Sequence, residues 1–342
     1  MSRVNYPRIG FFLIYLLLFI NSLTLAYDYP VVVDLGAYGF QNNESLAIND
    51  LGQVIGLGDQ EALLYDHGNI THISGFESVS GSWPVIAINN NTQIAGLMDG
   101  GFVHIWENGT AIKLAVQPNT TLTVASSINN SAVVAGWTYR SVGIPYTACV
   151  WENDNVTDLG SPDGSSVANG INDLGQVVGS YGDGYAYLYE TGVWTFLNNW
   201  TPANQGWDAS RNAWDINNNG KIAGSAYKDS VLHACVWDNG TITDLGVGEA
   251  FAINDLGQAV GIGPGYGILY DNGITYNLND LVDPGLGWTL GVAYDINNSG
   301  WIVGLGTNPS GQNSAYLLIP EPTSLTILAL GGLCFLRRVH KR

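Results

Sequence analysis

The sequence has few of the residues that suit exposed helices. Among its 342 residues there are only 11 Lys and Arg together and 2 Met, whereas 44 are Gly, 18 are Tyr and 11 are Trp. Exposed helices draw on Lys, Glu, Arg and Met, and Gly weakens the interior of a helix. Hydrophobic residues make up 46% of the chain, which excludes a disordered protein. An all-β fold is therefore expected.

Basic residues are scarcest in the central part of the chain. Between Tyr27 and Ile319 there are 5 Lys and Arg against 28 Asp and Glu, so this part has a net charge of -23, compared with -18 for the whole chain. Binding to a phosphate backbone requires Lys and Arg that displace counterions. The charge therefore excludes DNA and RNA as partners.

Cysteine and histidine are also rare. Three cysteines are too few for a disulfide framework, and the five histidines show no metal-ligand spacing with a nearby carboxylate. A fold without disulfides or structural metal sites must be stabilised by its hydrophobic core. We expect no catalytic metal site built on histidine.

Long hydrophobic runs occur only near the two ends of the chain. Residues 1–26 combine a basic start, an apolar stretch of about ten residues and small residues before Tyr27, which is typical of a secretory signal peptide cut after Ala26. An uncleaved anchor is the alternative, but the run is shorter than the roughly 20 residues of a spanning helix. We therefore expect a secreted protein.

The other end has three ordered parts within residues 320–342. Pro320, Glu321 and Pro322 precede an apolar run, and a basic cluster that includes Arg337 and Arg338 follows it. The basic cluster would stay on the cytoplasmic side of a membrane. This tail resembles the PEP-CTERM sorting signal of Gram-negative bacteria. The resemblance implies that an exosortase processes the tail in the inner membrane and that the protein reaches the cell surface or extracellular matrix; a plain membrane anchor is the alternative.

One motif, Ile-Asn followed by six residues and Gly, recurs seven times at spacings of 37 to 45 residues. Its copies begin at Ile48, Ile88, Ile128, Ile171, Ile216, Ile253 and Ile296. Each copy predicts four short β-strands separated by turns rich in Asn, Asp and Gly. Four antiparallel strands in roughly 40 residues, repeated radially, predict a seven-bladed β-propeller over residues 27–319.

The last copy reaches Pro320 without a fourth strand. Residues 31–36 have the pattern of that missing strand, matching residues 156–160. We expect the N-terminal strand to complete the last blade and to close the ring, which leaves no open sheet edge.

The repeats resemble the HAF-type extracellular repeat family. His233 to Trp237 is close to the His-Ala-Phe-Leu-Trp pattern of that family, and several units end in Asp-Leu-Gly. Cys149 and Cys235 stand where the family has Phe, and we expect both to be small buried side chains that form no disulfide. The resemblance implies a scaffold and a location, with no catalytic role to carry over.

Several aromatic and acidic residues are candidate binding groups. One aromatic residue recurs in most units and is expected to pack between blades, whereas Trp83 and Trp200 are candidate carbohydrate contacts. Asp50, Asp173 and Asp255, in the Asn-Asp-Leu-Gly turns, and Asp183 offer oxygen ligands of the kind that calcium takes. Turn chemistry explains the same acids without a metal, so calcium stays an alternative.

No acidic pair stands out from the turns, and we assign no catalytic residue. The expected function is a structural or ligand-binding role in the extracellular matrix, with extracellular polysaccharide as a candidate partner. Two alternatives stay open. One is a polysaccharide lyase or glycosidase at the propeller channel, which needs carboxylates about 5 to 9.5 Å apart, and the other is a calcium-dependent adhesion or lectin-like module.

Overall fold

The computed structural model describes residues 29–40, 46–58, 61–76, 86–98, 100–141 and 146–321. The sequence also predicts an N-terminal signal helix and a C-terminal hydrophobic helix on either side of the propeller. Both helices and most of the sorting tail lie outside the described residues. So do three residues of the candidate sites, Pro322, Arg337 and Arg338, and the candidate carbohydrate contact Trp83. In the part of the chain that the structure describes, no helix is long and apolar enough to cross a membrane.

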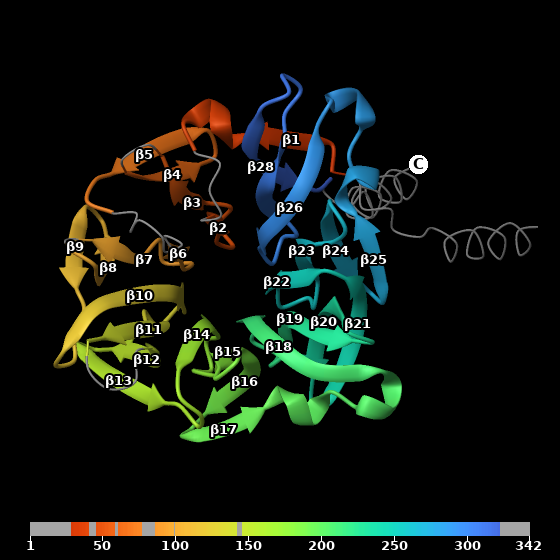
Figure 1. Ribbon diagram of the computed structural model, residues 1–342. Helices are drawn as coiled ribbons and strands as arrows, with labels where there is room; N and C mark the ends of the chain where they lie inside the picture. Colours follow the sequence, from red (N-terminus) through yellow and green to blue (C-terminus); the bar gives the residue numbers. More distant parts are fainter. Residues whose placement is uncertain are drawn as a thin grey trace, which may run out of the picture.

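The described chain folds into seven four-stranded antiparallel sheets arranged in a ring (Figure 1). Two cavities lined by the inner strands form the central channel of this ring. The prediction of an all-β, seven-bladed propeller is confirmed. Each blade has one strand next to the channel, and the following strands of that blade lie progressively farther out. The repeated motif therefore corresponds to one blade, with Ile-Asn at the end of the innermost strand.

The first three blades follow one another in the chain. Blade 1 contains β2 (Leu46–Ile48), β3 (Val54–Leu57), β4 (Ala62–Asp66) and β5 (Asn69–Ile73). Blade 2 contains β6 (Ala87–Ile88), β7 (Ile94–Met98), β8 (Phe102–Glu107) and β9 (Thr110–Lys113). Blade 3 contains β10 (Thr120–Ile128), β11 (Val134–Arg140), β12 (Tyr146–Glu152) and β13 (Asn155–Gly160).

The next three blades keep the same order. Blade 4 contains β14 (Ser166–Ile171), β15 (Val177–Tyr181), β16 (Tyr185–Glu190) and β17 (Val193–Phe196). Blade 5 contains β18 (Trp207–Ile216), β19 (Ile222–Lys228), β20 (Val231–Asp238) and β21 (Thr241–Val247). Blade 6 contains β22 (Glu249–Ile253), β23 (Ala259–Ile262), β24 (Gly267–Asp271) and β25 (Ile274–Asn277).

Blade 7 combines strands from both ends of the described chain. It contains β26 (Thr289–Ile296), β27 (Ile302–Thr307), β28 (Asn313–Ile319) and, as its outermost strand, β1 (Val31–Asp34). β1 is antiparallel to β28, with Val31 opposite Ile319 and Asp34 opposite Tyr316. Short 3₁₀ helices lie between strands, namely η1 (Leu35–Tyr38), η2 (Leu197–Trp200), η3 (Ala203–Gln205), η4 (Leu278–Asp280) and η5 (Pro284–Leu286).

The core is divided among the interfaces between blades. Seven hydrophobic clusters lie in the described residues, and each joins two neighbouring blades, including blades 7 and 1. The repeated aromatic residues lie in these clusters or pack against them, which confirms their packing role: Tyr65, Trp106, Trp151, Tyr189, Trp237 and Tyr270.

The two cysteines of the propeller also belong to the core. Cys149 and Cys235 are free thiols with no exposed surface, as expected. Burial raises the pKa of Cys149 to about 11 and raises that of Cys235 well above its usual value. Both therefore behave as small apolar side chains.

The glycine that ends each repeat motif permits a β-bulge in five blades. In blades 3 to 7 the innermost strand contains a register shift opposite this glycine, as between Ala125 and Ser127. A Cβ atom on Gly136 would lie 1.9 Å from the carbonyl oxygen of Val124, and one on Gly224 would lie 2.0 Å from that of Asn212. Any other residue would therefore displace the bulged strand, and bulges redirect side chains.

Candidate functional site

At one end of the channel, the seven Asn residues of the Ile-Asn motif form a closed ring of hydrogen bonds. The side-chain amide of each Asn donates to the backbone carbonyl of the equivalent Asn in the next blade, at 2.8 to 3.1 Å. The last of these bonds runs from Asn297 to Asn49 and joins blade 7 to blade 1. All seven Asn side chains are buried.

The same Asn side chain also shapes its own hairpin turn. The Oδ1 atom of Asn49 accepts from the backbone N–H groups of Leu51 and Gln53, and the other six copies do the same two and four residues downstream. Asn offers both an acceptor and a donor at the required reach, whereas Asp offers no donor. This double role explains why Asn occurs in every copy.

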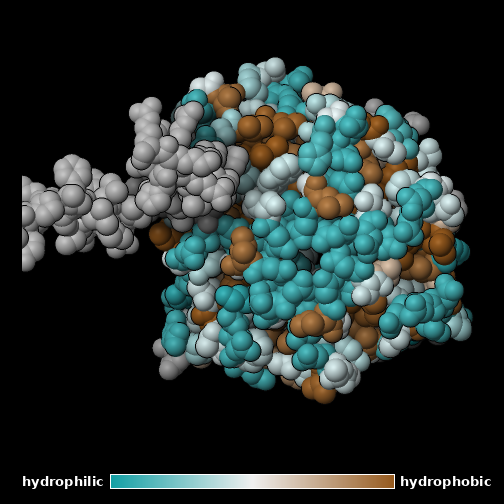
Figure 2. Space-filling view, turned by 180° about the vertical axis from the view of Figure 1, so that it is seen from behind, coloured by the Kyte–Doolittle hydropathy of each residue, from teal (hydrophilic) through white to brown (hydrophobic). Residues whose placement is uncertain are grey.

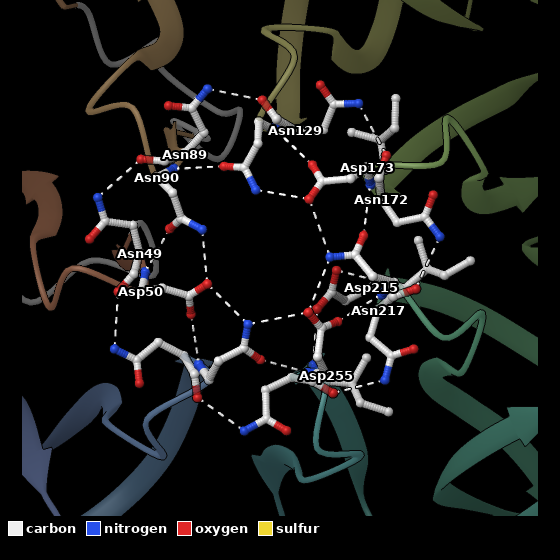
Figure 3. A pocket seen from close by; sticks show the side chains of 18 of the residues that line it. Asn49, Asp50, Asn89, Asn90, Asn129, Asn172, Asp173, Asp215, Asn217 and Asp255 are labelled. Carbon is white, nitrogen blue, oxygen red and sulfur yellow. Dashed lines mark hydrogen bonds between the residues drawn. The ribbon is translucent and has the colours of Figure 1, made fainter.

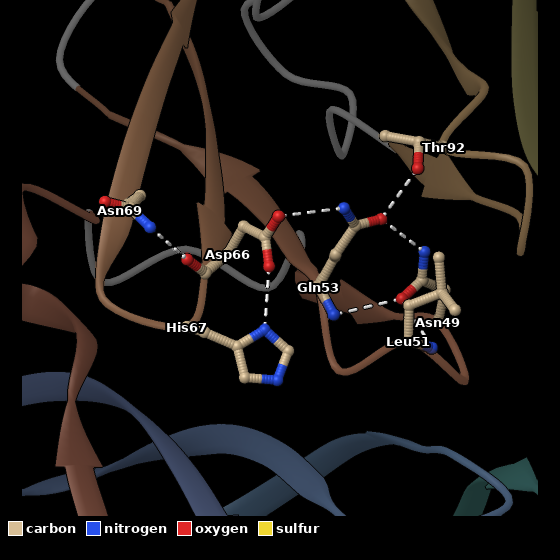
Figure 4. A network of polar contacts seen from close by, with 7 residues as sticks. All are labelled: Asn49, Leu51, Gln53, Asp66, His67, Asn69 and Thr92. Carbon is tan, nitrogen blue, oxygen red and sulfur yellow. Dashed lines mark hydrogen bonds and ion pairs between the residues drawn. The ribbon is translucent and has the colours of Figure 1, made fainter.

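Blade 1 shows how the ring is tied to the rest of a blade (Figure 4). Gln53 accepts from Asn49 and from Thr92 of blade 2, both at 2.8 Å, and donates to Asp66 at 3.2 Å. Hydrogen bonds from His67 and Gln53 lower the pKa of Asp66. The network links the channel to the outer hairpin of the blade. Its side chains satisfy one another by hydrogen bonds, so no ligand is needed to explain them.

The next residue of each motif forms a second ring around the channel (Figure 3). The backbone N–H of each donates to the side-chain oxygen of its counterpart in the following blade, at 2.8 to 2.9 Å. In order, the members of this second ring are Asp50, Asn90, Asn130, Asp173, Asn218, Asp255 and Asn298. The structure thus brings three of the four candidate calcium ligands together.

No two carboxylates are neighbours in the second ring. Three is the largest number that a ring of seven can hold in this way, and Asn amides donate to the Oδ2 atom of each carboxylate from both sides, at 2.8 to 3.2 Å. Asp183 lies apart, in the turn between β15 and β16, where its backbone carbonyl accepts from Arg211. In the described part of the chain, no group of three or more His, Cys, Asp or Glu residues could hold a metal ion. Calcium binding at these residues stays a prediction.

The two rings line a polar cavity of about 160 Å³. Figure 2 shows hydrophilic residues around a hollow at the centre of the face seen from behind. Because every blade contributes the same three positions, this end of the channel is nearly sevenfold symmetric. The hydrogen bonds that join each blade to the next account for the residue types found here.

The opposite end of the channel breaks that symmetry. A pocket of about 220 Å³, here called the channel-mouth pocket, is formed mainly by the two residues that precede Ile-Asn in each blade. Two blades contribute aliphatic side chains, two contribute polar ones and three contribute aromatic ones: Leu46, Ile86, Ser126, Asn169, Trp214, Phe251 and Tyr294. The β-bulges of blades 3 to 7 project the last five of these toward the pocket.

Two carboxylates lie in the wall of the channel-mouth pocket. Asp215 on β18 accepts from the backbone N–H groups of Ile216 and Ile253 at 2.8 and 2.9 Å, and Asp295 on β26 accepts from those of Ile296 and Ile48, both at 2.8 Å. Each acid therefore joins its own blade to the next one. Both residues are half-buried in the channel wall.

Burial raises the pKa of both acids despite these hydrogen bonds. The pKa of Asp215 is raised to about 6, with a further contribution from Asp255, and that of Asp295 to about 7, with contributions from Asp215 and Asp50. Carboxyl groups with such values titrate near neutral pH, which is a frequent property of functional sites.

The sequence interpretation missed this pair, although a signal was present. The residue before Ile-Asn is Ala in three copies, Ser in one and Gly in one, and it is acidic only at Asp215 and Asp295. The other aromatic candidate, Trp200, lies in η2, partly buried and packed against the cluster between blades 4 and 5. Its contact with carbohydrate stays a prediction.

Solved propellers share this architecture at low sequence identity. A catalytically inactive variant of virginiamycin B lyase from Staphylococcus aureus, solved with quinupristin, is 11% identical, with a TM-score of 0.53 over 84% of this chain and 99% of that chain. YCF48 bound to D1 peptide is also 11% identical, with a TM-score of 0.53 over 87% and 98%. The likeness is one of fold. No protein-family model and no curated protein sequence matches the propeller.

Proposed function

We propose that this protein is a secreted propeller of the cell surface or extracellular matrix that binds a ligand in its channel-mouth pocket. The observation that carries the proposal is the loss of sevenfold symmetry at that end of the channel. Positions that repeat in every blade are explained by the fold. Positions that differ from blade to blade need another explanation. At this pocket they include two acids at the end of an apolar and aromatic wall.

The size of the pocket limits what enters it. Its volume of about 220 Å³ is below the roughly 300 to 1,000 Å³ of sites that enclose a drug-sized molecule. We infer that it admits one end group or one ring of a longer ligand. The end of an extracellular polysaccharide, stacked on an aromatic side chain, fits this description.

The variant Ser126→Trp tests this proposal, because the larger side chain should fill the pocket without requiring a new backbone conformation. Trp214 occupies the equivalent bulge position in blade 5, so Ser126→Trp places a side chain that this position already accepts in another blade. We expect glycan-array binding by the full-length protein to be lost in this variant. Thr157→Trp, on the outer strand β13 of the same blade, is the control and should bind normally. Equal binding by all three proteins would refute a ligand site at the channel mouth.

The sorting part of the proposal has a separate test. β28 ends at Ile319, directly before Pro320, so a deletion of residues 320–342 removes no strand of the propeller. If these residues are an exosortase signal, the shortened protein should be exported but released into the medium. Unchanged delivery to the cell surface would show that the tail does not sort the protein.

A polysaccharide lyase or glycosidase is the second candidate function, because two carboxyl groups with raised pKa values, those of Asp215 and Asp295, line the same pocket. Both oxygens of each acid, however, accept backbone hydrogen bonds, which ties them to strand ends. Binding without turnover is therefore favoured. Release of oligosaccharides from matrix polysaccharide by the wild-type protein, but not by Asp295→Asn, would reverse this choice.

A further inference from the structure

The channel-mouth pocket has a continuous aromatic wall on one side. The rings of Trp214 and Phe251 are 5.9 Å apart at 72°, and those of Phe251 and Tyr294 are 6.0 Å apart at 34°. The three residues come from consecutive blades and are all partly exposed. The Nε1 atom of Trp214 donates to Glu249 at 3.1 Å, which holds the indole ring in place.

The charge of the pocket has one sign. Asp215 and Asp295 directly follow two of the wall residues, and no Lys, Arg or His is among the described residues that line the pocket. The second ring adds the carboxylates of Asp50 and Asp255 on the channel side, which act on the pair electrostatically. An anion would be repelled here, and a positively charged end group would bind more tightly than a neutral one of the same shape.

We propose that the channel-mouth pocket binds an organic cation, with an ammonium group beside Asp215 and Asp295 and an apolar stem or ring against the wall of Trp214, Phe251 and Tyr294. This inference rests on the ligand site of the proposed function and names its chemical class. Aromatic faces attract cations within about 6 Å, and the attraction grows when the cation is desolvated. The carboxylates supply the counter-charge.

A metal ion fits the same residues less well. Each carboxylate oxygen already accepts a backbone N–H, and the described residues offer no third acidic, His or Cys ligand that converges with this pair. Metal ions bind through several oxygen or nitrogen ligands and gain nothing from an aromatic wall. An ammonium group needs only acceptors and a nearby aromatic face.

Binding of a cation should be coupled to loss of a proton. The pKa of Asp295 is about 7 and that of Asp215 about 6 because burial and the neighbouring acids disfavour their charged forms. A cation stabilises those charged forms, so it binds the deprotonated pocket more tightly and releases protons when it binds near pH 6.5.

The test uses two probes of the same shape that differ in charge. Cyclohexylmethylamine is protonated at all pH values used, as Lys is, whereas cyclohexylmethanol is neutral. Calorimetric titration of the full-length protein near pH 5 and near pH 8 should show that the amine binds at least tenfold more tightly at the higher pH. The alcohol should bind weakly and independently of pH.

Two further measurements guard against a misfolded variant. Titration of the wild-type protein near pH 6.5 in buffers of different ionisation enthalpy should reveal proton release with the amine alone. Asp295→Asn should weaken amine binding at least fivefold near pH 8 and reduce the proton release, whereas Asp154→Asn, in an exposed turn of blade 3, should change neither.

The outcomes separate this inference from the proposed function. Equal binding of both probes, without proton release, would overturn the cationic class and leave a ligand site at the channel mouth standing. Absence of amine binding would also overturn the inference, whereas the Ser126→Trp comparison on glycans would still decide the site itself.

Discussion

Asp295 should make the stability of the propeller fall as the pH rises from about 4 to about 7. Its pKa is about 7 in the folded protein, against the ordinary 3.8, chiefly because of burial. Between these two values the folded state binds a proton that the unfolded state has lost. Stability therefore declines with increasing pH across this window and levels off above it.

The magnitude follows from the two pKa values. A rise from 3.8 to about 7 corresponds to about 4 kcal/mol of stability that is present near pH 4 and absent near pH 8. Asp295→Asn removes this dependence but leaves the backbone N–H of either Ile296 or Ile48 without its acceptor, which costs about 1 to 3 kcal/mol at every pH. The variant should thus be less stable than the wild type near pH 4 and more stable near pH 8.

Equilibrium unfolding in urea, followed by tryptophan fluorescence from about pH 4 to about pH 8, measures this difference directly. The curves of free energy against pH for the wild type and Asp295→Asn should cross. Asp154→Asn, at an exposed turn, should run parallel to the wild type. Parallel curves for Asp295→Asn would refute the assignment of this pH dependence to Asp295.

Three further predictions concern the structural residues. Asn218→Asp should destabilise the fold at neutral pH by about 2 kcal/mol or more and much less near pH 4, because it makes three adjacent carboxylates in the second ring; melting temperatures at the two pH values measure this. Gly224→Ala should cost more than about 2 kcal/mol in urea unfolding, since the new Cβ meets a backbone carbonyl. Burial opposes ionisation of Asp244, but hydrogen bonds from Lys228 and His233 lower its pKa. Asp244→Asn should therefore cost about 1 kcal/mol near pH 7, with the loss shrinking as the pH falls below about 4.

The repeated motif was sufficient to predict the blades, because each copy carries its own turns and its own packing residues. Only part of the role of Asn49 could be predicted from the sequence. Its place in a hairpin turn follows from local chemistry, whereas its hydrogen bond to Asn89 depends on the distance between neighbouring blades. Asp50 could be read as a turn residue or a calcium ligand, and neither interpretation reveals a partner 40 residues away.

Asp215 and Asp295 were harder to recognise for a related reason. Their identity departs from the other copies, which the sequence displays, but their position in the channel wall depends on β-bulges in β18 and β26. A bulge shifts the alternation of side chains by one residue, so strict alternation does not indicate which residues line the pocket. The glycine opposite each bulge is the one local trace of it.

The order of synthesis decides when the two rings of hydrogen bonds can close. β1 and Asn49 precede their partners β28 and Asn297 in the chain, so they are synthesised first. Until the partners are made, the growing array has an Asn amide at one end and a carbonyl group at the other, each without its neighbour. Six folded blades form an open arc with unpaired groups at both ends. The seventh blade closes this arc, because it contacts both blade 6 and blade 1.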